Sequence, residues 1–207
     1  MKFDNIIIGG GLSGLIAGIE SQKSEKNTAI ISAGQSALHF WSGSFEFLGE
    51  KNGEVIIENP LDKTETLPES HPYRIIGKNR LSGLLSRVKP ILNEAGIHVT
   101  GDLERNHYRI TPFGILKPAW LSLDEYLTVK HPDELKEKRI AIVNIEGYID
   151  FYPRFLNYGL SQHGAKCSIS AINIPQLDVL RKSTTEMRAT NMSRFSATTP
   201  STSLPKR

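Results

Sequence analysis

Three glycines near the N-terminus have the types and spacing of a phosphate-binding turn. Gly9, Gly11 and Gly14 form the pattern G-x-G-x-x-G, directly after the segment NIII at 5–8. In a strand–turn–helix, the first glycine allows the tight turn, the second lets backbone approach a pyrophosphate, and the third lets helix and strand pack closely. The phosphates would face the free N–H groups of the helix. The context predicts a dinucleotide-type βαβ unit; the alternative is a structural turn that binds no ligand.

The elements that position these glycines can be read from the surrounding pattern. Leu12, Leu15, Ile16 and Ile19 follow helical spacing, which predicts a helix with one buried face. Residues 28–33 then read as a second parallel strand. Two buried strands joined by a helix make the βαβ unit.

The end of the second strand departs from the usual dinucleotide pattern. An Asp or Glu about twenty residues after the glycines normally binds the ribose hydroxyls. Here Ser32, Ala33 and Gly34 occupy those positions, and no arginine is near to suggest a phosphorylated ribose. The adenosine end is weakly specified, so FMN or a degenerate site stays open beside FAD.

Further along the chain the pattern predicts a mixed sheet and then a second α/β region. Strands are expected at 54–58, 97–100, 108–111 and 113–120, a linker at 61–70, and a helix at 81–92 that Pro90 kinks and Gly96 ends. The apolar strand 140–145, a helix closing at Gly164 and the strand 167–174 form the second region. It lacks G-x-G-x-x-G, so we interpret it as scaffold or substrate domain. A helix should follow over 176–192.

Composition bounds the class of protein. The chain has 207 residues, 39% hydrophobic and 23% charged, as in ordinary globular proteins. A net charge of +3 gives no argument for a nucleic-acid partner. The one cysteine, Cys167, cannot form an internal disulfide, which fits a reducing compartment. The scattered histidines predict no metal site, and no stretch is apolar and long enough to span a bilayer.

Several segments together resemble a known family. These are the strand–GGGLSGL–helix, GQSALHFWSGS at 34–44, His71-Pro72-Tyr73, ITPFGILKPAWLS at 110–122, IAIVNIEGYIDF at 140–151 and residues 177–195. In this order they resemble the B subunit of anaerobic glycerol-3-phosphate dehydrogenase. The fold class implied is α/β, a Rossmann-like FAD/NAD(P)-binding domain with a partial second α/β region.

The resemblance carries expectations about function. It implies a flavoprotein of glycerol metabolism and anaerobic respiration, with FMN or FAD as cofactor. Its complex would oxidise sn-glycerol 3-phosphate to dihydroxyacetone phosphate and pass electrons to quinone. The partners implied are a catalytic flavin subunit and a membrane-bound iron–sulfur subunit. This chain would then be cytoplasmic and peripheral at the inner face of the cell membrane.

The resemblance also suggests site residues. Gly9, Gly11 and Gly14 are assigned to the flavin phosphates. The small residues of the following loop are assigned to pyrophosphate or ring-proximal contacts, and they are Ser36, Ser42, Gly43 and Ser44. His39 is the best candidate for a polar group near the flavin, although a structural histidine is the commoner case. No catalytic residue is identified.

Two rival functions stay open. One is a flavin oxidoreductase of the fumarate-reductase type acting alone. The other is a non-catalytic docking subunit with a degenerate flavin site, which the missing ribose carboxylate favours. The resemblance stops near Phe195, so a shortened chain is expected, and it could be inactive alone. We divide it into an N-terminal part of the flavin domain at 1–138, a strand–helix–strand region at 139–195, and a disordered Ser/Thr-rich tail at 196–207.

Overall fold

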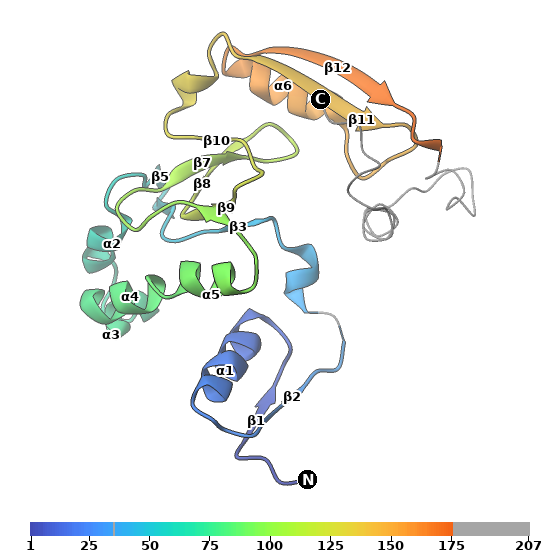
Figure 1. Cartoon of the computed structure of the whole chain (residues 1–207). Helices are drawn as coiled ribbons and strands as arrows, with labels where there is room; N and C mark the ends of the chain where they lie inside the picture. Colours follow the sequence, from blue (N-terminus) through green and yellow to red (C-terminus); the bar gives the residue numbers. More distant parts are fainter. Residues whose placement is uncertain (35, 176–207) are drawn as a thin grey trace. The chain divides into compact units, whose positions relative to one another are not determined.

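A computed structural model describes residues 1–34 and 36–175, apart from the side chain of His39 (Figure 1). The chain forms two compact units, Met1–Ser44 and a second unit that begins at Phe45. The predicted division at residue 138 stays a prediction, although strand β11 begins at Arg139, directly after it. The predicted helix 176–192 and the tail 196–207 lie outside the described residues.

The first unit is a βαβ unit, as predicted. Strands β1 (Asn5–Ile8) and β2 (Thr28–Ile31) are parallel, and helix α1 (Leu12–Lys23) connects them. A short 3₁₀ helix, η1 (Ala37–Phe40), follows. The α/β fold class expected from the sequence is confirmed by this arrangement and by the parallel pair of the second unit.

Helix α1 packs against the two strands at its glycines. A Cβ added to Gly14 would lie 2.0 Å from the carbonyl oxygen of Gly9, and one added to Gly18 would lie 2.8 Å from Ile30. Within α1, only Gly18 is buried. The predicted buried face was therefore wrong, since Leu12, Leu15 and Ile19 are each about two-fifths exposed. Glycines at i and i+4 leave no side chain between helix and strands, so that face makes the closest contact.

The second unit begins with helices packed against a small antiparallel sheet. The sheet order is β3 (Ser44–Phe45), β9 (Leu121–Leu123) and β6 (Val99–Thr100), with a hairpin of β4 (Glu50–Lys51) and β5 (Glu54–Val55) nearby in sequence. The helices are α2 (Pro60–Lys63), η2 (Thr64–Thr66), α3 (Pro72–Ile76), α4 (Lys78–Leu85) and α5 (Val88–Glu94). Phe47, Leu81, Val99, Trp120 and Leu121 form their core.

A second sheet and a second βαβ unit follow. The sheet order is β10 (Thr128–Val129), β7 (His107–Ile110) and β8 (Leu116–Ala119). After the 3₁₀ helix η3 (Pro132–Leu135), the parallel strands β11 (Arg139–Ile145) and β12 (Lys166–Ile172) are joined by α6 (Pro153–Gln162). Val129, Leu135, Ile142 and Leu160 are the largest members of the shared core.

A buried amide connects segments of the second unit that are distant in sequence. Asn106 is fully buried, and its Nδ2 donates to the carbonyl oxygens of Phe47 at 3.1 Å and Ile56 at 2.9 Å. Its backbone N–H donates to Ile57. These bonds fix the start of β7 against the 47–57 segment, because buried carbonyls without partners are costly.

Two local predictions were wrong. The helical segment breaks at Ser86–Arg87, between α4 and α5, rather than at Pro90. Pro90 lies in the first turn of α5, where its missing N–H would have had no partner. The expected linker 61–70 contains the short helix α2 and η2. The predicted stop at Gly96 is confirmed, since its φ is +73° and α5 ends at Glu94.

No helix among the described residues has the length and apolarity required to cross a membrane.

The first prediction concerns the closest contact in the first unit. Gly14→Ala should destabilise the protein by about 1–3 kcal/mol or more, because the new methyl group overlaps the carbonyl oxygen of Gly9. Urea unfolding followed by far-UV circular dichroism measures the change. Gly83→Ala is the matched control, since a Cβ on this α4 glycine meets nothing within 4 Å. Equal unfolding midpoints for the two variants would contradict the packing described.

Candidate functional site

The glycine turn connects β1 to α1 in a backbone conformation that suits glycine. Gly9 has a φ of +110°, and its N–H donates to the carbonyl oxygen of Ile31 at 2.8 Å. This bond fixes the turn to the end of β2. A side chain at Gly9 would be strained by its φ, so the residue type is set by the backbone.

The N-terminus of α1 is open to a ligand. Its N-cap, Gly11, is extended and makes no side-chain capping bond, and the first turn contains no acidic residue. A Cβ on Gly9 would meet nothing within 4 Å, and one on Gly11 would meet only the Cβ of Ser36 at 3.9 Å. Uncapped N–H groups at the positive end of a helix dipole suit a phosphate.

The carboxyl end of β2 brings a hydroxyl group to the same turn. A Cβ added to Gly10 would lie 2.9 Å from Oγ of Ser32, so this side chain sits directly against the glycine turn. The Ser32 hydroxyl donates to the carbonyl oxygen of Gly34 at 2.9 Å. Sequence reasoning considered this position only as the site of a missing carboxylate. The hydroxyl is itself a hydrogen-bonding group beside the glycine turn.

The predicted loop residues fall into two places. Ser36 lies beside Gly11, and its Oγ accepts from the N–H of Leu38, which caps η1. Ser42, Gly43 and Ser44 form one turn, in which Gly43 has a φ of +75° and the two serine hydroxyls are 3.1 Å apart. The assignment of all four to flavin contacts stays a prediction. The side chain of His39 lies outside the described part of the structure.

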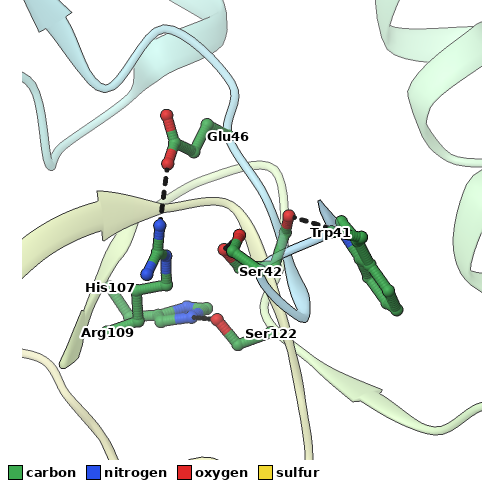
Figure 2. A network of polar contacts seen from close by, with 7 residues as sticks. Trp41, Ser42, Glu46, His107, Arg109 and Ser122 are labelled. Atoms are coloured by element: carbon green, nitrogen blue, oxygen red, sulfur yellow. Dashed lines mark hydrogen bonds and ion pairs between the residues drawn. The ribbon is translucent and has the colours of Figure 1, made fainter. Parts of the chain in front are cut away.

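Trp41 closes this serine turn. Its Nε1 donates to the carbonyl oxygen of Ser44 at 2.9 Å, and Ser44 is buried (Figure 2). The indole therefore has a structural role in holding the turn.

A cluster of buried polar side chains in the second unit was missed by sequence reasoning. Figure 2 shows the imidazole of His107 directed to Ser122 and the guanidinium of Arg109 directed to Glu46. The His107 Nε2 to Ser122 Oγ distance is 2.8 Å, and the Arg109 Nη2 to Glu46 Oε1 distance is 3.2 Å. The available signal was the alternation in HYRI, with polar residues at i and i+2 of a strand.

Burial sets the protonation of this histidine. Desolvation lowers the pKa of His107 below its ordinary value, and the negative charge of Asp102 opposes the shift without reversing it. The imidazole is therefore neutral near pH 7, with one nitrogen engaged by the Ser122 hydroxyl. No group of three metal-ligating side chains occurs among the residues that the structure describes.

Comparison with known proteins decides the family. A family described as "FAD binding domain" matches residues 4–199. The chain belongs to this family. The resemblance recognised in the sequence is also supported by curated relatives named as the B subunit of anaerobic glycerol-3-phosphate dehydrogenase, at 39% identity over 202 residues in Actinobacillus pleuropneumoniae, 38% over 198 in Yersinia enterocolitica and 36% over 202 in Pasteurella multocida.

Each of these alignments covers 94% of this chain and 47% of the relative. The chain thus spans about half the length of the curated relatives it matches. The match to the FAD binding domain family ends at residue 199. No solved structure matches the chain.

The residues present fit the phosphates of an FAD. Side chains on Gly9 and Gly11 would occupy an open region in front of the α1 N-terminus. Because these residues are glycines, that region has room for a diphosphate. Ser32 has a hydroxyl where the dinucleotide pattern has a carboxylate, so it lacks that charge, and the hydroxyl donates to Gly34. The first unit therefore provides the donor set for the diphosphate and a weaker one for the adenosine.

The second prediction separates flavin binding from folding. Gly11→Ala should leave the urea midpoint unchanged, because the new Cβ makes only an ordinary contact with Ser36. The methyl group would obstruct the approach of a pyrophosphate, so the Kd for FAD should rise about tenfold or more. Fluorescence titration with FAD measures this, with Gly83→Ala as control. An unchanged Kd would rule out binding of the diphosphate at this turn.

The third prediction concerns pH. The pKa of His107 is lower in the folded protein than in the unfolded chain. Below about pH 6.5 the unfolded chain therefore binds more protons than the folded protein. The free energy of unfolding falls as the pH drops from there towards the folded pKa. The stability difference between wild type and His107→Gln should therefore shrink from pH 7.5 to pH 5.5. Urea unfolding at both pH values measures it, and the other histidines cancel between the two proteins. Parallel pH dependence would contradict the burial argument.

Proposed function

We propose that this chain is the flavin-binding part of the B subunit of an anaerobic glycerol-3-phosphate dehydrogenase, with FAD rather than FMN as its cofactor. The observation that carries the proposal is the open glycine turn at Gly9–Gly11, with the uncapped N-terminus of α1 behind it. The names of the relatives support the choice of enzyme.

The reaction of the complex is the oxidation of sn-glycerol 3-phosphate to dihydroxyacetone phosphate. The substrate loses a hydride from C2 and a proton from its hydroxyl group, and the two electrons pass finally to quinone. When bound, the flavin accepts hydride equivalents and releases single electrons. The residues of this chain would hold its diphosphate at α1 and orient its ribose through the hydroxyl of Ser32.

The partners and the location belong to the same proposal. A catalytic flavin subunit and a membrane-bound iron–sulfur subunit would complete the complex, and the chain would be cytoplasmic and held at the inner face of the membrane through them. The word "subunit" in the names of the relatives supports an assembly of several chains.

A second candidate function is a docking subunit with a degenerate flavin site. It is favoured by one observation, that the hydroxyls of Ser42 and Ser44 bond to each other and the carbonyl of Ser44 to Trp41, so these groups are already engaged. In this case the chain would keep the βαβ geometry and bind flavin weakly or not at all.

The fourth prediction distinguishes these functions. Purified protein incubated with FAD should retain an absorbance band at about 450 nm after desalting. Ser32→Ala should weaken FAD binding and leave FMN binding unchanged, since FMN has no adenosine ribose. The measurement is titration of the wild type and of Ser32→Ala with FAD and with FMN. A protein that stays colourless with either flavin supports the docking function, and equal loss of FAD and FMN by Ser32→Ala would remove the argument for FAD.

A further inference from the structure

Strand β7 presents two polar side chains on one face. Its sequence alternates, and the partly buried Tyr108 and Ile110 pack against the core formed by Val129, Leu135 and their neighbours. Successive side chains of a strand point to opposite faces. His107 and Arg109 therefore project from the other face of the β10-β7-β8 sheet.

Arg109 is a buried cation, and its ion pair with Glu46 uses only part of its hydrogen-bonding capacity. Its side chain is 9% exposed, while that of Glu46, with which it pairs, is 52% exposed. The Nε of Arg109 is buried and has no hydrogen-bond acceptor within the described part of the chain. A guanidinium is always charged and has five N–H donors in a planar fork, so leaving one buried and unpaired is unfavourable.

A second cation lies opposite Arg109 on the next strand. In the antiparallel pairing of β7 with β8, Arg109 is directly across from Lys117, and on its other side it is across from Thr128 of β10. Directly opposed residues project from the same face, and like charges in this position destabilise the pair. Lys117 is exposed and has no carboxylate partner among residues 1–34 and 36–175.

The charges on this face do not balance. In the described part of the chain, Arg109 is paired with the carboxylate of Glu46 and Lys117 with none, which leaves one positive charge. His107 adds none, because burial disfavours the charged form of its imidazole. A ligand carrying two negative charges would neutralise both cations, whereas a monocarboxylate would only repeat what Glu46 already does.

We propose that the Arg109–Lys117 face of the β10-β7-β8 sheet binds a phosphate monoester, which takes the place of the Glu46 carboxylate. The planar guanidinium fork suits phosphate oxygens, the Lys117 ammonium adds a point charge, and the Thr128 hydroxyl can donate a further hydrogen bond. Resting on the proposed function, the ligand is the phosphate group of sn-glycerol 3-phosphate, and Arg109 is its anchor.

Glu46 acts as the resident counter-ion in the absence of ligand. Its half-exposed carboxylate can rotate into solvent without leaving a buried charge behind, whereas the buried Arg109 cannot. The phosphate thus exchanges with an internal anion, and its affinity is reduced by that competition.

The experiment is isothermal titration calorimetry on the 207-residue chain without flavin, at constant ionic strength. Inorganic phosphate and sn-glycerol 3-phosphate should bind, and glycerol and acetate should not. Lys117→Gln should raise the Kd about fivefold, as for loss of a single exposed charge. Arg109→Gln should raise it about thirtyfold or more. Glu46→Gln should lower it about threefold or more, because the competing anion is gone.

The matched control is Lys63→Gln, an exposed lysine on α2, which should leave the Kd unchanged. If no phosphate binding is detected up to about 20 mM, the Kd is weaker than that of ordinary millimolar recognition, and the proposal is overturned. Weaker binding by Glu46→Gln also overturns it, as does an equal effect of Lys117→Gln and Lys63→Gln. If circular dichroism finds Arg109→Gln unfolded, the Kd values of Lys117→Gln and Glu46→Gln test the proposal. Phosphate binding without sn-glycerol 3-phosphate binding overturns the assignment to substrate. The flavin spectrum is independent of these outcomes and tests the proposed function separately.

Discussion

The first unit depends on the contact between Gly14 of helix α1 and the carbonyl oxygen of Gly9. Only the absence of a side chain allows the helix to approach this closely, since an added Cβ would lie 2.0 Å from that oxygen. The contact sets the distance between α1 and β1. It thereby directs the free N–H groups of the first helical turn to the open region beside Gly9 and Gly11. The phosphate-binding geometry is a consequence of this packing constraint.

The second unit is organised by buried hydrogen bonds at β7. Asn106 joins the strand to the carbonyl oxygens of Phe47 and Ile56, and His107 joins it to Ser122 of β9. These bonds are between neutral groups, and among the described residues the Oδ1 of Asn106 is a buried acceptor without a donor. Arg109 differs, because it carries a charge, its buried Nε has no acceptor among the described residues, and the Glu46 carboxylate that pairs with it is half exposed. This difference is the physical reason to assign a ligand to Arg109 and a structural role to the other two.

The parallel strands of the first unit leave apolar side chains exposed. In the first unit, Ile6 is 60% and Ile8 is 87% exposed, although parallel strands are usually buried on both faces. The sequence led us to expect burial, because an apolar run is typical of a covered strand. One helix and two strands do not supply enough side chains to cover both faces. In the second unit, Leu135 and Leu160 are almost fully buried, while Val143 and Ile169 of the parallel strands are nearly half exposed.

The sequence by itself determined the local elements and the chemistry of the turn. Glycine spacing after an apolar strand predicted the β1–α1–β2 unit, and quoted segments such as GQSALHF predicted the family, because both depend on residues close together in the chain. It could not determine which face of α1 meets the strands, since the apolar spacing and the glycine spacing gave different answers. Only tertiary structure brought Arg109 opposite Lys117 and beside Glu46, since strand register and the pairing of residues 63 positions apart depend on packing.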